Sequence, residues 1–200
     1  MIIHLPSFVG FTRLFIAFCW LGFLVGFVLR KPSAAGETRR RAPAATAGIG
    51  LQSIGIAAVW SLVAERFPDF ALPEVILRIL CVLAVLLAVA SVWLVVEAIR
   101  VLGRQWSIQA RLVEGHRLVV EGPYSHMRHP IYTGMLGMLL ATGMAFSVWW
   151  ALLIATPVFA VGTAVRVRAE EKLLHDAFGE DFEAYRDYVP AVIPRWKTRS

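Results

Sequence analysis

Charged residues are scarce in this 200-residue chain, and cysteine is almost absent. Asp, Glu, Lys and Arg make up 17% of the sequence, whereas 58% is hydrophobic. A soluble domain of this length has too little interior to bury so much apolar surface. Both cysteines, Cys19 and Cys81, lie inside apolar runs, which gives no support to a disulfide framework or a metal site. The composition excludes a soluble enzyme, a disordered tail and a collagen-like fibre, and it predicts a multi-spanning membrane protein.

Long apolar runs supply the spans. A transmembrane helix needs roughly 20 mostly apolar residues. The sequence predicts five such helices, over Phe8–Leu29, Gly48–Ala64, Val75–Val96, Ile131–Ser147 and Val148–Val165. The last two runs follow each other with almost no polar residue between them, so we expect a tight helical hairpin over residues 131–165. The predicted fold class is an all-α integral membrane protein, with three N-terminal spans in residues 1–101 and a second unit in residues 102–200.

Basic residues indicate the orientation. The formal net charge is +6, and in a membrane chain such residues mark cytoplasmic loops more often than a nucleic-acid partner. The loop at 30–47 and the region between the third and fourth spans are rich in arginine, whereas the loop at 65–74 is mainly acidic. We therefore expect the N-terminus outside, the C-terminus in the cytoplasm and no nucleic-acid partner. The first loop, rich in Pro, Ala, Gly and Thr, is interpreted as a mobile linker.

Polar residues concentrate in two stretches, Gly103–Tyr132 and Arg166–Trp196, on either side of the predicted hairpin. A hairpin brings its own ends together, so we expect these stretches to form a composite site at the cytoplasmic membrane surface. The second stretch is predicted to continue the fifth helix to a C-cap at Gly179, followed by a short amphipathic helix over Phe182–Tyr188. The alternative is two ordinary solvated segments beside the membrane, in which Arg128 and Tyr132 are lipid-headgroup anchors.

Six motifs lie along the second half of the chain: His116-Arg117-Leu118-Val119, Gly122-Pro123-Tyr124, Arg128-His129-Pro130-Ile131-Tyr132, Glu170-Glu171, Phe178-Gly179 and Val189-Pro190. In their order and spacing they resemble the isoprenylcysteine carboxyl methyltransferase family. Phosphatidylethanolamine N-methyltransferases share a looser version of the same signature. The resemblance extends from Leu102 to Pro194, and the N-terminal spans show no motif. One departure is Phe182, which stands where the family commonly has tyrosine.

This resemblance implies a membrane enzyme that uses S-adenosyl-L-methionine without a Rossmann fold, and the sequence has no Gly-rich loop between a strand and a helix. It implies a cytoplasmic cofactor pocket made by the segment before the hairpin and the helix after it. Arg166 falls where the family places a substrate-contacting arginine and is the candidate catalytic residue. The cofactor-binding residues implied by motif position are Gln109, His116, Arg117, Leu118, Val119, Tyr124, Arg128, His129, Pro130, Ile131, Tyr132 and Glu170.

The implied acceptor is a lipophilic, isoprenylcysteine-like molecule that enters from the bilayer. A carboxylate acceptor is already ionised at neutral pH and needs no general base, and Arg166 could orient it. An amine acceptor would need a base, which favours O-methylation over N-methylation. Two alternatives stay open: a phospholipid or lipid-amine N-methyltransferase, and a non-catalytic membrane scaffold. The compact chain favours a bacterial inner membrane, where the acceptor could be another lipophilic acid, thiol or amine.

Overall fold

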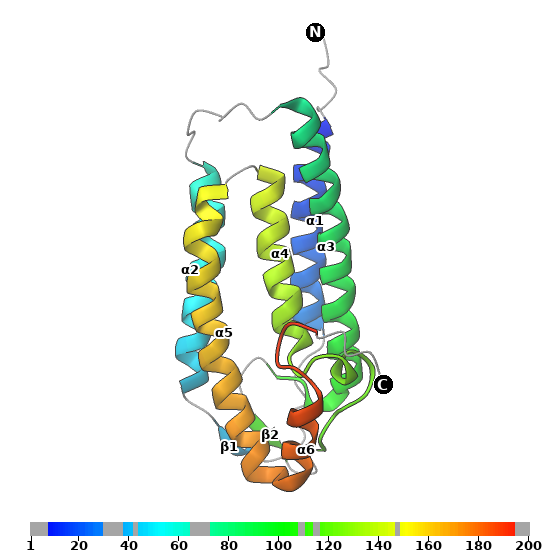
Figure 1. Cartoon of the computed structure of the whole chain (residues 1–200), viewed down its shortest axis with the longest axis vertical. Helices are drawn as coiled ribbons and strands as arrows, with labels where there is room; N and C mark the ends of the chain where they lie inside the picture. Colours follow the sequence, from blue (N-terminus) through cyan, green and yellow to red (C-terminus); the bar gives the residue numbers. More distant parts are fainter. Residues whose placement is uncertain are drawn as a thin grey trace.

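The computed structural model describes residues 8–29, 38–41, 44–64, 73–107, 111–113, 117–146 and 149–194. This part of the chain is a helical bundle with one small strand pair (Figure 1). The helices are α1 (Phe8–Leu29), α2 (Ala44–Ala64), α3 (Glu74–Leu102), α4 (Pro130–Phe146), α5 (Trp149–Phe178) and α6 (Glu180–Tyr188). The structure also contains two short 3-10 helices, η1 (Gly103–Gln105) and η2 (Gly122–Ser125). Its two strands are β1 (Thr38–Arg41) and β2 (Arg111–Val113).

Three of these helices are long and apolar enough to cross a membrane, by length and composition: α1 over Phe8–Phe27, the whole of α3, and α5 over Trp150–Phe178. The apolar stretches of α2 and α4, Ala45–Ser61 and Pro130–Phe146, are shorter. Each of the five predicted spans is therefore found as an apolar helix. The described part of the chain is helical, and its apolar helices have the length and composition typical of a multi-pass membrane protein.

The helices divide into two groups that meet along α4. Helices α2 and α5 lie side by side along most of their length, and α4 packs chiefly against α3 with α1 beside them (Figure 1). One apolar core lies between α1, α3 and α4, and includes Ile16, Ala88 and Met138. A second core joins α4 to the other pair through Leu139 and Phe159. Because α4 contributes to both cores, it fixes the two groups relative to each other.

Small residues allow the closest helix contacts. A Cβ atom added at Gly162 of α5 would lie 2.8 Å from the carbonyl oxygen of Gly48 in α2. On the other side of the bundle, a Cβ at Gly134 of α4 would lie 2.9 Å from the carbonyl oxygen of Ser91 in α3. Backbones that approach so closely gain van der Waals contact, which drives helix association where the surrounding lipid removes the hydrophobic driving force.

The predicted hairpin is present, and its second helix runs far past the first. With 30 residues α5 is about 45 Å long, whereas the 17 residues of α4 span about 26 Å. Helix α4 begins at Pro130, whose missing N–H is harmless in a first turn. Helix α5 ends at Phe178, and Gly179, at the position predicted to end it, has φ +51° and is the N-cap residue of α6. The lower end of α5 therefore lies beside the segment that precedes α4.

The strand pair corrects the interpretation of the first loop. Residues Thr38 to Arg41 pair antiparallel with Arg111 to Val113, with Arg41 opposite Arg111. A mobile linker does not fit these residues, and α2 begins at Ala44, inside the predicted loop of 30–47. Strand pairing depends on a partner about 70 residues away in the chain, so local composition could not reveal it.

Candidate functional site

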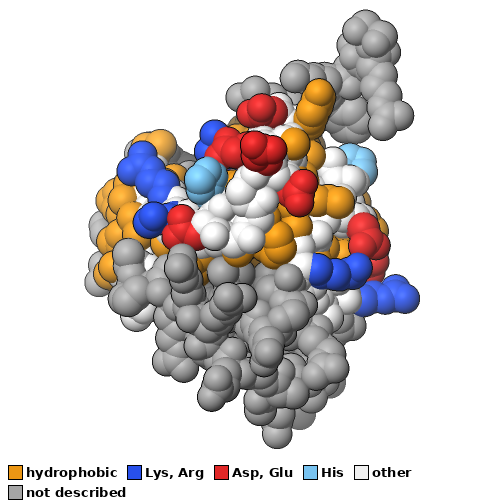
Figure 2. All heavy atoms as spheres, turned by 90° about the horizontal axis from the view of Figure 1, so that it is seen from below, with side chains coloured by type: hydrophobic (Ala, Val, Ile, Leu, Met, Phe, Trp, Pro, Cys, Tyr) orange, Lys and Arg blue, Asp and Glu red, His pale blue; other side chains and the backbone are white. Residues whose placement is uncertain are grey.

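The candidate site lies at the end of the bundle where α5 extends past the start of α4. Seen onto this end, acidic and basic side chains gather on the described surface (Figure 2). Side chains from two distant stretches of sequence meet here: Arg128, His129 and Tyr132 around the start of α4, and Arg166, Glu170 and Glu171 on α5. The structure thus brings together the two polar stretches that the sequence predicts to be neighbours.

Glu170 is the centre of the first part of the cluster. Its carboxylate accepts a short hydrogen bond from the hydroxyl of Tyr132 and, at 3.4 Å, an N–H from Arg166 one turn earlier on α5. The guanidinium of Arg166 also lies over the ring of Tyr132, with its Cζ atom 4.9 Å from the ring centroid. Arg166 is only 7% exposed. A buried arginine is thus held by a carboxylate and by an aromatic face.

His129 lies between two carboxylates. Its Nδ1 atom is 3.5 Å from Glu170 Oε2, and its Nε2 atom is 3.1 Å from Glu171 Oε1. Burial alone would lower the pKa of His129, but hydrogen bonds to both carboxylates and their negative charge outweigh it, so the pKa is raised above its usual 6.5. Only the protonated imidazole donates from both nitrogens, so this geometry favours the cationic form.

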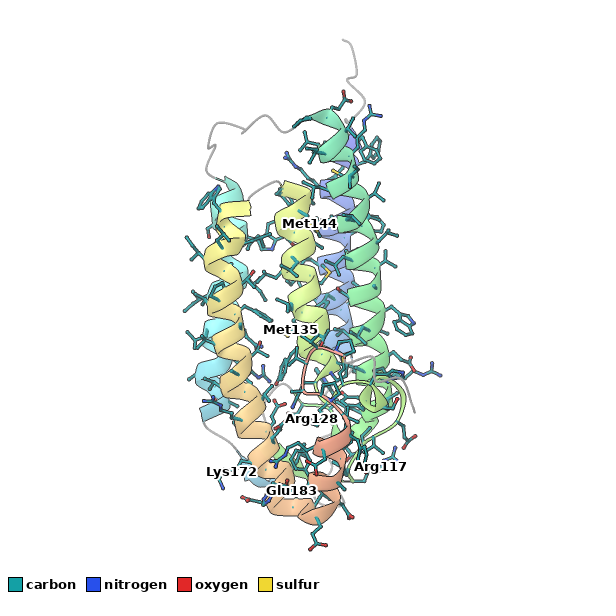
Figure 3. All side chains as sticks on the ribbon, in the orientation of Figure 1. Arg117, Arg128, Met135, Met144, Lys172 and Glu183 are labelled. Carbon is teal, nitrogen blue, oxygen red and sulfur yellow. The ribbon has the colours of Figure 1, made fainter. Side chains whose placement is uncertain are left out.

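Arg128 joins the cluster to the segment that follows α6. Its Nε atom donates to Glu171 at 2.8 Å, and an amino group donates to the carbonyl oxygens of Arg186 and Val189. Together with residues 186–191, Arg128 also lines an open hollow of about 400 Å³. Figure 3 shows Arg128 near the start of α4, whereas Lys172 and Arg117 lie toward the periphery. Arg128 therefore borders both the buried cluster and a space that a polar molecule could enter.

The segment after α6 is hydrogen-bonded along the start of α4. The backbone N–H groups of Arg128 and His129 donate to the carbonyl oxygens of Pro190 and Ala191, at 2.9 and 2.8 Å. The hydroxyl of Thr133 donates to the carbonyl oxygen of Val192 at 2.6 Å. These bonds satisfy donors ahead of α4 that have no helical partner, and they fix the backbone that carries Arg128 and His129.

Tyr124, in η2, lies near the cluster. Its backbone carbonyl accepts a hydrogen bond from the hydroxyl of Tyr185 in α6 at 2.6 Å, and its side chain is buried. Burial, followed by the negative charge of Glu170, raises the pKa of Tyr124 well above its usual value. Phe182, the departure from the family pattern, is also buried and packs edge-on against Tyr185. This buried position is filled by an apolar ring that carries no hydroxyl.

Not every predicted cofactor residue reaches this cluster. Val119 and Ile131 pack with Tyr124 against the end of α3, and Pro130 is buried at the start of α4. Arg117 is largely exposed and pairs with Glu121 at 3.3 Å, and Leu118 beside it is half-buried. Gln109 and His116 lie outside the described residues. The motif positions thus separate into a polar group around Glu170 and an apolar group against α3.

Comparison with known proteins identifies the family. The phospholipid methyltransferase family profile matches residues 79–181, from within α3 into the start of α6. The chain belongs to the phospholipid methyltransferase family. All of the polar cluster described above lies within the matched residues.

Relatives of this chain carry different names. It is 34% identical over 107 residues to protein-S-isoprenylcysteine O-methyltransferase B of Arabidopsis thaliana, which covers 48% of this chain and 50% of that protein. A protein-S-isoprenylcysteine O-methyltransferase of Schizosaccharomyces pombe is 35% identical over 40% of this chain and 34% of its own length. A cobalt-zinc-cadmium resistance protein of Cupriavidus metallidurans is 36% identical over 46% of this chain and 43% of its own. The chain spans about half the length or less of these relatives.

Methyltransferases of this family use S-adenosyl-L-methionine, and the chemistry of the cluster fits that cofactor. The cofactor carries a sulfonium, an ammonium, a carboxylate, a ribose and an adenine. The cluster offers carboxylates for the ammonium or ribose hydroxyls, guanidinium groups for the carboxylate, and aromatic rings for the cationic or flat parts. No group of three or more potential metal ligands occurs among the residues that the structure describes.

Two polar residues of the cluster were missed by sequence reasoning. From the sequence, Glu171 was named only as part of the Glu170-Glu171 motif and was given no role. In the structure its carboxylate binds both Arg128 and His129. Gln52 comes from α2, outside the family match, and accepts a hydrogen bond from Arg166 at 3.3 Å. A signal for Gln52 was present, because an amide side chain in an apolar span is rare enough to indicate function.

Proposed function

We propose that this chain is an S-adenosyl-L-methionine-dependent membrane methyltransferase that methylates the carboxylate of a lipophilic, isoprenylcysteine-like acceptor. The observation that carries the proposal is the convergence of Arg128, His129 and Tyr132 with Arg166 and Glu170 at one end of the bundle. We further propose that this end faces the cytoplasm, with the N-terminus outside, because the arginine-rich loops lie at the same end.

In this proposal, Glu170 holds the ammonium or ribose of the cofactor, and Arg128 meets its carboxylate. Tyr124 and Tyr132 supply aromatic walls, and His129 fixes the position of Glu170. When bound, the cofactor supplies a methyl group on a positively charged sulfur. The residues of the chain then have to align the acceptor oxygen with that methyl group and exclude water.

Arg166 is proposed to orient the acceptor carboxylate by a charge-assisted pair. The bound cofactor would supply the methyl group, and no residue of the chain would have to remove a proton because the acceptor carboxylate is already ionised at neutral pH. The contacts of His129 also support an acid acceptor, because both of its ring nitrogens lie against carboxylates and an imidazole held in this way is a poor general base. An amine acceptor would need such a base.

One finding favours a second candidate, methylation of a phospholipid amine. The family profile is that of phospholipid methyltransferases, although two of the relatives are named for isoprenylcysteine O-methylation and another for metal resistance. Membership of the family therefore leaves the acceptor open. Phosphatidylethanolamine and an S-farnesylated cysteine acid are the two probes that distinguish these candidates.

The cofactor is tested by the binding of S-adenosylhomocysteine to detergent-purified protein, measured by calorimetry. We expect micromolar affinity in the wild type and no measurable binding in Glu170→Ala. Alanine leaves Arg166 without its carboxylate partner, so Glu170→Gln, which keeps the shape of the side chain, serves as a second variant. Glu74→Ala is the matched control, because Glu74 is exposed and pairs with Arg78 at the start of α3.

Transfer of a labelled methyl group to the two probes then identifies the acceptor. Label on N-acetyl-S-farnesylcysteine supports the proposal, and label on phosphatidylethanolamine alone replaces it with the second candidate. Well-folded wild-type protein that does not bind S-adenosylhomocysteine would rule out both and leave a non-catalytic scaffold.

A further inference from the structure

Gln52 is a polar side chain buried inside an apolar helix. It lies in α2, is 1% exposed, and belongs to the part of the chain that the family profile does not match. A polar group in a membrane helix costs free energy unless it is hydrogen-bonded, and such groups mark functional sites by default. The contacts of its amide therefore indicate what Gln52 does.

Both ends of the Gln52 amide bind residues of α5. Its Oε1 atom accepts a hydrogen bond from an amino group of Arg166 at 3.3 Å, and its Nε2 atom donates to the hydroxyl of Thr163 at 2.9 Å. Thr163 and Arg166 are three residues apart, so they lie on the same face of α5. Thr163 therefore fixes the orientation of the amide that meets Arg166.

The approach of α2 to Arg166 depends on a glycine. A Cβ atom at Gly48, one turn before Gln52, would lie 2.5 Å from the Cγ atom of Arg166 and 2.7 Å from the carbonyl oxygen of Gly162. Only a residue without a side chain leaves room for the stem of Arg166 at this distance. Gly48 makes room for the stem, and Gln52 binds the guanidinium.

We propose that Gln52 is a positioning residue that holds Arg166 in the orientation needed to bind an acceptor carboxylate. The inference rests on the proposed function of Arg166. Gln52 and Glu170 accept from different amino groups of the guanidinium, at 3.3 and 3.4 Å, and its Cζ atom lies over the ring of Tyr132. These three contacts come from α2, α5 and α4, so all three helices define its position. Helix α2 is then part of acceptor recognition.

A purely structural role for Gln52 makes a different prediction. Interhelical hydrogen bonds of buried polar side chains also stabilise membrane bundles. Removing such a bond lowers stability but leaves the preference of the site for an acid unchanged. A positioning role affects the acceptor and spares the cofactor, because Gln52 reaches the cluster through Arg166.

The test compares Gln52→Leu, which removes both hydrogen bonds, with Gln52→Glu, which keeps an acceptor for Arg166. Thr142→Val in α4 is the matched control, since it removes another buried hydrogen bond, from the indole of Trp20. The readouts are S-adenosylhomocysteine affinity, KM and kcat for N-acetyl-S-farnesylcysteine, and the affinity ratio between this acid and its methyl ester.

For Gln52→Leu we expect KM to rise and the acid-to-ester ratio to fall, each on the order of ten-fold, which is what loss of a hydrogen bond to a charged group produces. S-Adenosylhomocysteine affinity should stay within about two-fold. Gln52→Glu should restore most of the ratio, and Thr142→Val should leave it unchanged. An unchanged ratio in well-folded Gln52→Leu would overturn the inference.

A second readout decides the inference if the wild type does not bind the farnesylated probe. Phenylglyoxal reacts with arginine side chains, and peptide mass spectrometry gives the modification rate at Arg166 alone. If Gln52 holds Arg166, Gln52→Leu should raise that rate several-fold, whereas Gln52→Glu and Thr142→Val should not. An equal rate in wild type and Gln52→Leu would overturn the inference, and lack of probe binding by the wild type would count only against the proposed acceptor.

Discussion

Two arginines, Arg13 in α1 and Arg166 in α5, make the same kind of aromatic contact at opposite ends of the bundle. The Cζ atom of Arg13 lies 5.3 Å from the ring centroid of Phe146, and that of Arg166 lies 4.9 Å from the ring of Tyr132. Arg13 is half-buried and donates to the backbone carbonyl of Ala145, whereas Arg166 is buried and binds Glu170 and Gln52.

The difference lies in what surrounds each guanidinium. A backbone carbonyl at the end of α4 accepts a hydrogen bond from the Nε atom of Arg13, and the neighbouring ring of Phe146 adds a cation–π contact. This arrangement anchors a helix end. The partners of Arg166 are a carboxylate and an amide supplied by different helices, so its position is determined from several sides. Identical residues at the ends of two spans are distinguished by the number of side chains that orient them.

The sharpest test of this comparison is to remove each arginine. Arg166→Ala should lower turnover of N-acetyl-S-farnesylcysteine by about 100-fold or more, because the acceptor loses its orientation. S-Adenosylhomocysteine affinity should persist, as measured by calorimetry. Arg13→Ala should change turnover by less than about three-fold. Equal losses in the two variants would show that Arg166 is a structural anchor like Arg13.

The next largest effect is a change in stability when a glycine is replaced on the helix packed against Arg166 or on the helix that carries Arg13. Gly48→Ala should destabilise the protein by about 1–3 kcal/mol, because the added methyl group meets Arg166 and the backbone of Gly162. Gly22→Ala, on the helix that carries Arg13, has nothing within 4 Å and should be neutral or stabilising by up to about 1 kcal/mol. Unfolding in a denaturing detergent measures both; similar values would refute the close contact at Gly48.

A smaller effect is the pH dependence of the cluster around Arg166. The folded state raises the pKa of His129 above 6.5, so its protonation stabilises the fold fully below that pH and the contribution is lost as the pH rises through the folded pKa. The Tm difference between wild type and His129→Gln should therefore shrink from about pH 6 to about pH 9. His126→Gln, in the exposed turn nearby, controls for loss of a histidine. A difference that grows with pH would contradict this assignment.

The smallest effect is expected nearer the end of the bundle that carries Arg13. Thr142→Val removes the 2.9 Å hydrogen bond from the indole nitrogen of Trp20. Bonds of this kind in membrane proteins contribute about 0.6 kcal/mol on average, so the change in unfolding free energy should be of that order. Trp20→Phe removes the same bond from the other side together with part of the ring contacts with Phe23 and Trp60, so its loss should be larger. If Thr142→Val lowered the unfolding free energy by several kcal/mol, the half of the bundle near Arg13 would also contain a tightly held polar site.

Hydropathy predicted where the helices lie in the sequence but not which helices pack against each other. The apolar runs located α1 to α5, and the shortage of polar residues after Phe146 predicted the α4–α5 hairpin. The sequence did not predict that α5 packs chiefly against α2, because this pairing depends on Gly48 and Gly162 meeting across the interface. Hydrophobicity measures partition into lipid and is the same whichever helix lies alongside.

The candidate site was predictable to the extent that it follows from the hairpin. Once two polar stretches flank a hairpin, their ends must meet, and Arg128, Tyr132 and Glu170 do so. Position in a motif could not separate residues of the polar cluster from Val119 and Ile131, which pack on α3. Nor could it reveal Gln52, which joins the cluster across an interface between helices distant in sequence. The cofactor roles of all these residues stay predictions.

The hydrogen bonds from Arg128, His129 and Thr133 to residues 190–192 have a consequence for protein synthesis. A chain emerging from the ribosome makes all five apolar helices before it makes the residues that hold the start of α4. The bundle can therefore enter the membrane while its polar end is unfinished. Only when residue 192 has left the exit tunnel can these hydrogen bonds form, so all five apolar helices are made before the backbone that carries Arg128 and His129 is fixed.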